Sequence, residues 1–252
     1  MYMVVRILFS GLMRGNADNW CTLKTQVDEY NAEIYVGSQS IEEWRPFFKY
    51  LNKEHLFETN TCTTKILDDT NISQSTHHIT KNTIIQWSNL YLTYKHFEDR
   101  FADSDIVIKL RNDWYIDGII PLDNIENSII YVPSTETHAP SGFDENIMMN
   151  DQIVLGRNNA MKIYYNYPYK FSYSDEARTI PNPHPKTSHG TNSVCNGSVV
   201  HPFHTSCGIE IVLRNYIRNE GLGLRKFELK YRRILWEKPE DYWVGIERPL
   251  AY

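Results

Sequence analysis

Three groups of polar and charged residues stand beside predicted β-strands, where side chains of an α/β sheet commonly bind ligands. The first group follows the apolar, β-branched run of residues 3–9 and contains Ser10, Gly11 and Arg14. Glycine lets the backbone approach a ligand closely, and an arginine can pair with a phosphate. Because many strands end in Ser or Gly without binding anything, this group alone is a weak signal.

The second group is Lys109-Leu110-Arg111-Asn112-Asp113, at the end of the apolar sequence DIVIKL. A carboxylate at Asp113 can hold a divalent cation that bridges a diphosphate. Lys109 or Arg111 can neutralise the same phosphates directly. The alternative for these residues is a polar turn at the protein surface that binds no ligand.

The third group, Asn150-Asp151-Gln152, precedes an apolar run at residues 153–155. The carboxylate of Asp151 stands at the start of this predicted strand, where it can face the same cleft as the other two groups. Asn-Asp pairs also form turns readily, so a purely structural role is the alternative.

Apolar periodicity indicates which elements position these groups. Strands are predicted at residues 3–9, 33–37, 105–110, 128–132, 151–155 and 225–235. Helices are predicted at residues 18–30, 41–51, 83–101, 158–167 and 207–219, with Asn82 as an N-cap and Gly221 closing the last helix. The strand–helix–strand–helix order at the start implies parallel strands with crossover helices. We therefore expect an α/β fold whose ligands bind at the carboxyl ends of the strands.

Composition and charge exclude several kinds of partner. The formal net charge of -5 provides no basic field for nucleic acid or an anionic membrane, so neither is expected. No apolar run approaches the roughly 20 residues of a membrane span, and the apolar start is too short for a signal peptide. The four cysteines lack the spacing of a disulfide framework, so we expect a cytoplasmic protein with reduced thiols.

The order of several motifs resembles a known enzyme family. The motifs are RILFSGLMR, IIQWSNLYLTYK, DIVIKLRND, NDQIVLGRNNAMKIY and FELKYRRI, and they extend from residue 6 to about residue 234. In this order the chain resembles GT-A-type glycosyltransferases found among lipopolysaccharide- and capsule-synthesis proteins and large-virus glycosylation genes. Each motif is only moderately specific, and their order and spacing carry most of the resemblance.

The resemblance implies a single GT-A-like domain, with residues 1–120 as the nucleotide-sugar half and residues 121–252 as the acceptor half. It implies that Ser10, Gly11 and Arg14 line the nucleotide pocket and that Gln86 lies near the cleft. Asp113 would stand at the metal and diphosphate motif, with Mn²⁺ or Mg²⁺ as the cation. Here Asn112 precedes it instead of a second acid, so metal dependence stays open.

The resemblance also implies the reaction, which is transfer of a sugar from a nucleoside-diphosphate sugar to a glycan acceptor. The departing diphosphate needs positive charge, from a cation at Asp113 or from Arg and Lys side chains. The acceptor hydroxyl needs a base, for which we choose Asp151 in an inverting reaction, with Glu210, Asp144 and Glu145 as reserves. UDP is the expected carrier and GDP the alternative, and sequence does not separate inversion from retention.

Other functions compete with this interpretation. One is a catalytically inactive sugar- or nucleotide-binding module on the same fold, and another is a nucleotidyltransferase, whose usual glycine-rich, lysine-containing loop is absent from residues 10–15. A zinc site is a third, since Cys195, His201, His204 and Cys207 lie close together, although in no common ligand spacing. Residues 172–204 form a long polar segment, for which we expect a lid or acceptor loop.

Overall fold

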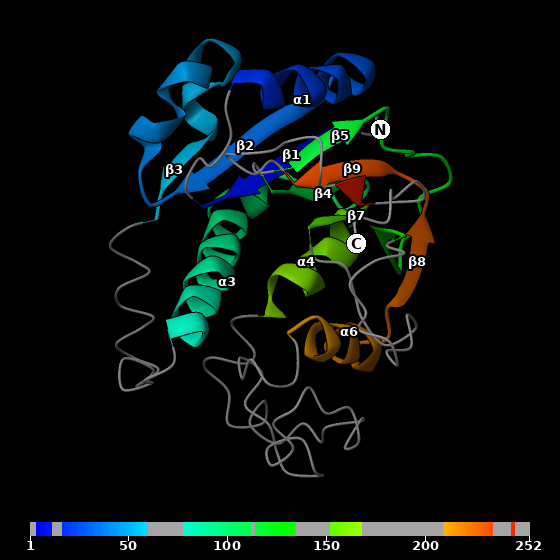
Figure 1. The fold of residues 1–252 in the computed structure, drawn as a ribbon. Helices are drawn as coiled ribbons and strands as arrows, with labels where there is room; N and C mark the ends of the chain where they lie inside the picture. Colours follow the sequence, from blue (N-terminus) through cyan, green and yellow to red (C-terminus); the bar gives the residue numbers. More distant parts are fainter. Residues whose placement is uncertain are drawn as a thin grey trace, which may run out of the picture.

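A seven-stranded sheet lies at the centre of the protein (Figure 1). The computed structural model describes residues 4–11, 17–59, 78–111, 114–134, 152–167, 209–233 and 243–244. The sheet has the strand order β3-β2-β1-β4-β7-β6-β8. In chain order its strands are β1 (Val5–Ser10), β2 (Glu33–Ser38), β3 (Leu56–Glu58), β4 (Ile106–Leu110), β6 (Ile129–Pro133), β7 (Ile153–Arg157) and β8 (Gly223–Phe227).

Most neighbouring strands in this sheet are parallel. The pairs β3–β2, β2–β1, β1–β4 and β6–β8 are parallel, whereas β7 runs antiparallel to both of its neighbours, β4 and β6. The α/β fold class, a single domain with a mostly parallel sheet flanked by helices, is therefore confirmed. The predicted division into halves near residue 120 stays a prediction.

Helices cover both faces of the sheet (Figure 1). One face packs against α1 (Ala17–Tyr30) and the 3₁₀ helix η1 (Ile41–Tyr50). The other face packs against α3 (His78–Phe97), α4 (Asn158–Tyr165) and α6 (Ile209–Asn219). Two short 3₁₀ turns, η2 (Lys53–His55) and η4 (Glu98–Arg100), connect helices to strands. Among the described residues, we find no helix with the length and hydropathy that crossing a membrane requires.

Strand β4 shows how the two faces form separate cores. Ile106, Ile108 and Leu110 belong to the core on the α1 side, and Val107 belongs to the core on the α3 side. Each fully buried aliphatic side chain contributes roughly 1.5–3 kcal/mol relative to an exposed one. A strand buried on both faces reads as a continuous apolar run, which is why the sequence predicted this strand correctly.

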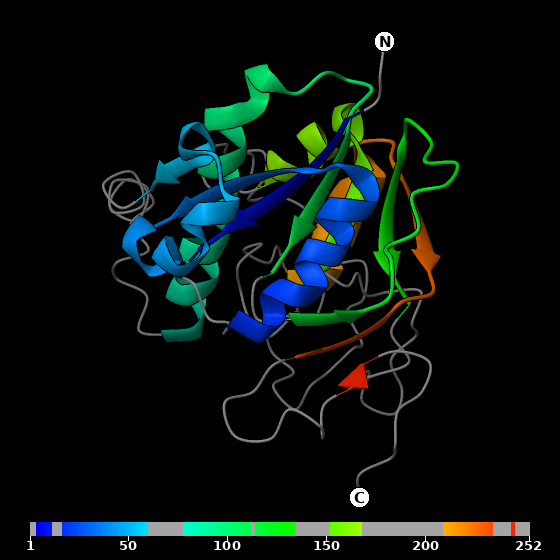
Figure 2. The same ribbon diagram turned by 90° about the horizontal axis from the view of Figure 1, so that it is seen from above.

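A second, three-stranded antiparallel sheet lies beside the first and can be followed from above (Figure 2). It consists of β5 (Trp114–Asp117), β9 (Lys230–Arg233) and β10 (Trp243–Val244), with β9 in the middle. The prediction of one continuous strand at residues 225–235 is wrong, because the chain leaves the first sheet after β8 and enters the second sheet at β9. Apolar alternation continues through buried Leu229 across this change, so the pattern alone cannot reveal it.

Three local predictions also need correction. The helix expected at residues 41–51 is the 3₁₀ helix η1, and Pro46 in its middle explains why an α-helix is unfavourable there. Helix α3 begins at His78, so Asn82 lies inside the helix and is not its N-cap. The three-residue strand β3 was not predicted, since a strand this short has no periodicity to detect.

The predicted end of α6 is confirmed. Gly221 has a φ of 78°, and its N–H group donates to the carbonyl oxygen of Arg218 at 3.0 Å. The N–H group of Leu222 donates to Ile217 O at 3.1 Å, which satisfies a second carbonyl at the end of the helix. Residues 172–204, predicted to form a lid or acceptor loop, lie outside the described residues.

Candidate functional site

The order of the strands reverses direction between β1 and β4. From β1 the chain moves outward through β2 and β3 on one side, and it then returns to place β4 on the other side of β1. In open α/β sheets, ligands bind outside the carboxyl ends of the strands at such a switch point, because the loops there leave in opposite directions. The ends of β1 and β4 are therefore the place to examine.

Strand β1 ends at this switch point with Ser10 and Gly11. Ser10 is half-buried and pairs with Gly37 of β2, and the N–H group of Gly11 donates to Gly37 O at 2.8 Å. Gly11 has a φ of 101°, which favours glycine, and a Cβ atom added there would have no described atom within 4 Å. The backbone after β1 is thus held in place at Gly37, and none of the described atoms crowds Gly11.

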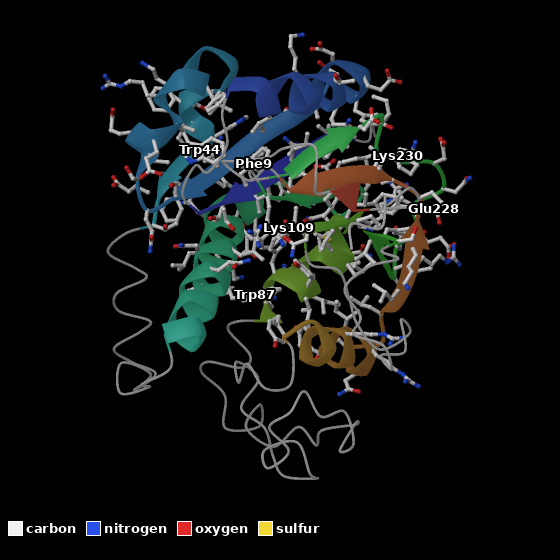
Figure 3. All side chains as sticks on the ribbon, in the orientation of Figure 1. Phe9, Trp44, Trp87, Lys109, Glu228 and Lys230 are labelled. Atoms are coloured by element: carbon white, nitrogen blue, oxygen red, sulfur yellow. The ribbon has the colours of Figure 1, made fainter. Side chains whose placement is uncertain are left out.

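Strand β4 ends beside β1 with two basic residues. Lys109 is opposite Leu8 of β1, and its side chain, with 3% exposure, lies on the face covered by α3 and α4 (Figure 3). Arg111 follows the strand directly and is half-buried. Its neighbours across the sheet, Leu8 and Val154, are core residues, and an ammonium group is costly to bury there without a compensating charge or hydrogen bond.

Strand β7 brings a third polar residue to the same edge because it is antiparallel to β4. Leu110 pairs with Ile153, so half-buried Gln152, which precedes β7, stands next to Arg111. Sequence reasoning did not assign a role to Gln152. The signal was its place beside Asp151, but only the antiparallel pairing of β7 shows that the start of this strand and the end of β4 share one edge.

The structure brings together four of the predicted site residues, namely Ser10, Gly11, Lys109 and Arg111, although their roles stay predictions. Gln86 lies on α3 with an exposed side chain. Its neighbour Trp87 is buried against α4, with ring centroids 5.8 Å from Tyr164 and 5.1 Å from Tyr167. Glu210 lies in α6. Outside the described residues lie Arg14, Asp113, Asp144, Glu145, Asp151, Cys195, His201, His204 and Cys207.

The second sheet brings a basic segment of the chain to the strand that follows Asp113. In the β5–β9 pair, Trp114 is opposite Arg233 and Asp117 is opposite Lys230. Residues 230–233 have the sequence KYRR, which carries three basic residues in a chain whose net charge is negative. Sequence analysis did not anticipate this pairing, because it joins segments more than 100 residues apart.

The described residues at the carboxyl edge suit an anion better than a metal ion. The charged side chains at the ends of β1 and β4 and the start of β7 are Lys109 and Arg111, both cations. Divalent cations prefer carboxylate and other oxygen ligands, and no group of three His, Cys, Asp or Glu residues occurs in the part of the chain that the structure describes. The Mn²⁺ or Mg²⁺ predicted at Asp113 therefore has no support among these residues, and it stays a prediction that rests on Asp113.

A different charged cluster occupies the opposite edge of the same strands. Arg6 at the start of β1 donates to Asp105 Oδ2 at 3.1 Å and to the hydroxyl of Tyr35 at 2.8 Å, and it also pairs with Glu33. Asp105, 2% exposed, additionally accepts from the N–H groups of Ala102 at 3.0 Å and Val4 at 3.3 Å. These charges are satisfied within the protein, which indicates a structural role.

Two ionisable groups near this cluster have shifted pKa values. Burial raises the pKa of Tyr35 above its usual value, and the nearby positive charge of Arg6 offsets part of this rise. Burial lowers the pKa of His55, whose ring stacks on Tyr35 with centroids 4.0 Å apart. Sequence reasoning missed the whole cluster, because its members come from three separate segments of the chain, β1, β2 and the residue before β4.

Comparisons with known proteins find similar chains among the solved structures. No protein-family model matches the chain, and no curated protein matches it. The chain is similar to mouse xyloside xylosyltransferase 1 in its apo form, with a TM-score of 0.43 and 11% sequence identity over 90% of this chain and 86% of that one.

Proposed function

We propose that this protein is a glycosyltransferase that moves a sugar from a nucleoside-diphosphate sugar, with UDP as the expected carrier, to a glycan acceptor. The observation that carries the proposal is the convergence of Ser10, Lys109, Arg111 and Gln152 at the switch point of the sheet. Two cations and two neutral polar groups at that edge suit a ligand that combines phosphates with hydroxyl groups. The resemblance of the motif order to GT-A-type enzymes supports sugar transfer as the reaction.

The chemistry follows from where charge develops. As the bond between the sugar and the phosphate breaks, negative charge grows on the departing diphosphate, and Lys109 and Arg111 stabilise it. In the low-dielectric surroundings of a 3% exposed side chain, the attraction between the ammonium group and a phosphate is stronger than in water. Asp151, which precedes Gln152, accepts the proton of the acceptor hydroxyl, a role that typically contributes roughly 10²–10⁴-fold.

Binding of UDP, measured by isothermal titration calorimetry with and without manganese, tests the first part of the proposal. We expect Lys109→Ala and Arg111→Ala each to weaken UDP binding roughly 10- to 100-fold, the usual effect of losing a hydrogen bond to a charged group. Arg45→Ala is the matched control, since the Arg45 side chain is 73% exposed on η1, on the other face of the sheet. If the native protein binds neither UDP nor GDP, or if the three variants behave alike, the proposal is wrong.

Turnover tests the second part. Release of UDP from UDP-sugars, with and without glycan acceptors, should fall roughly 10²–10⁴-fold in Asp151→Ala while UDP binding is kept. UDP binding without any turnover in the native protein would instead identify a binding module that does not transfer sugar.

A further inference from the structure

Gln152 is held in a fixed place at the carboxyl edge of the sheet. The two residues after it, Ile153 and Val154, are fully buried in β7, and they pair with Leu110 and Lys109 of the central strand β4. A residue attached to the buried centre of a sheet is positioned more accurately than one on a long loop. Gln152 is itself only half-buried, so it borders the surface at the point where β4 ends.

The chemistry of Gln152 differs from that of its neighbours on β4. Lys109 and Arg111 are permanent donors that suit phosphate oxygens, whereas an uncharged amide both donates and accepts hydrogen bonds. Sugar hydroxyl groups likewise donate and accept, so an amide can satisfy both functions of a hydroxyl at once. Adjacent strands lie about 5 Å apart, roughly the step from a phosphate to the sugar ring attached to it.

We propose that Gln152 is a specificity-determining residue that hydrogen-bonds a hydroxyl group of the transferred sugar, while the basic residues at the end of β4 hold the diphosphate. This inference rests on the proposed function, and it assigns different parts of the ligand to neighbouring strands. Charge on β4 recognises the part that all nucleotide sugars share, and the amide at the start of β7 recognises the part in which they differ. A sugar-binding amide affects affinity for a nucleotide sugar and leaves affinity for the free nucleoside diphosphate unchanged.

The experiment compares the native protein with Gln152→Met, which keeps the length of the side chain and removes its amide. Dissociation constants are measured for UDP and for UDP-glucose, UDP-galactose, UDP-N-acetylglucosamine and UDP-xylose, and the tightest-binding sugar nucleotide is used for the comparison. We expect roughly 3- to 10-fold weaker binding of that sugar nucleotide, as for loss of one neutral hydrogen bond, and a change below about 2-fold for UDP.

Two further variants keep the result interpretable. Gln152→Ala should repeat the selective loss, which separates removal of the amide from any effect of the methionine sulfur. Asn127→Ala removes an exposed amide before β6, at the opposite edge of the sheet, and should change neither affinity. Equal losses for UDP and the sugar nucleotide, or no loss for either, would overturn the inference while leaving the proposed function intact. Failure of the native protein to bind any nucleotide would overturn both.

Discussion

Helix α3 approaches β2 so closely at Gly37 that a single added methyl group should destabilise the protein. A Cβ atom built on Gly37 would lie 1.9 Å from Thr93 Oγ1 and 2.6 Å from both Cβ and Cγ2 of Thr93. Rotating the Thr93 side chain can move Oγ1 and Cγ2, but its Cβ is fixed to the helix backbone. Gly37→Ala can therefore be accommodated only by moving α3 away from the sheet.

The required movement gives the size of the effect. Ordinary van der Waals contact begins at 3.4 Å, so the helix has to shift by about 0.8 Å from its present position. Overpacking a core typically costs about 1–3 kcal/mol, and a shift of backbone belongs to the upper part of that range. For a chain of 252 residues, a loss of about 2–3 kcal/mol should lower the midpoint of thermal unfolding by roughly 4–12 °C.

A double-mutant cycle followed by circular dichroism tests the cause. Thr93→Gly removes all three conflicting atoms, at a cost in helix propensity and in the hydrogen bond from Thr93 Oγ1 to Asn89 O. In that background Gly37→Ala should be neutral or slightly stabilising, because alanine restricts the unfolded chain more than glycine does. An equal cost of Gly37→Ala in both backgrounds would refute the steric explanation.

Gly221→Ala provides the matched control for this cycle. Gly221 has a φ of 78°, and an added Cβ would meet no described atom within 4 Å, so the substitution tests backbone strain without a steric conflict. We expect a loss of about 1 kcal/mol that Thr93→Gly does not change, since the two sites share no partner. If Thr93→Gly changed the cost of Gly221→Ala as much as it changes the cost of Gly37→Ala, the coupling would reflect a general effect of Thr93→Gly and not the contact with Gly37.

Two further predictions concern buried Gln26 and two histidines, half-buried His55 and exposed His96. Gln26→Leu should lower the free energy of unfolding, measured in urea, by about 2–5 kcal/mol. The fully buried side chain of Gln26 donates to Gly118 O at 2.6 Å and accepts from Ile120 N at 2.8 Å, and both backbone groups would lose their partner. A loss below about 1 kcal/mol would contradict this explanation. Burial lowers the pKa values of His55 and His96, so the folded protein favours their neutral rings. The contribution of these neutral rings to the free energy of unfolding should be fully present above the unfolded-state pKa of about 6.5, and it should be lost as the pH falls through the lower pKa values of the folded state. Replacing both histidines by Phe should reduce the change in the urea unfolding midpoint between pH 7 and pH 5 relative to the native protein. An unchanged pH dependence of the midpoint would show that the two histidines do not cause it.

The sequence predicted the strands that carry the candidate site, because these strands are the ones with the strongest physical signal. β1 and β4 are mostly apolar and largely buried on both faces, so Ser10 at the end of β1 and Arg111 directly after β4 are easily recognised. That both strand ends lie at one edge followed from the rule for parallel strands joined by crossover helices.

The parts that could not be predicted depend on contacts between distant segments. Nothing in the apolar run at residues 153–155 reveals whether β7 is parallel or antiparallel, since these residues are apolar on both faces in either case. The pairing of β5 with β9 likewise depends on which edges remain available after the first sheet has formed. Local pattern fixes an element's type, whereas its partner and direction are decided by the whole chain.

The two edges of the central strands differ in the charges that the described residues bring to them. At the amino edge the guanidinium group of Arg6 is enclosed by Asp105, Glu33 and Tyr35, so an anion from solution would have to displace carboxylates already in place. At the carboxyl edge the charged residues that the structure describes next to the switch point, Lys109 and Arg111, have the same sign. A bound anion near both side chains would offset part of the cost of burying two charges of the same sign. The proposed function uses this difference, since it predicts that a phosphate-bearing ligand binds at the carboxyl edge while the amino edge has a structural role.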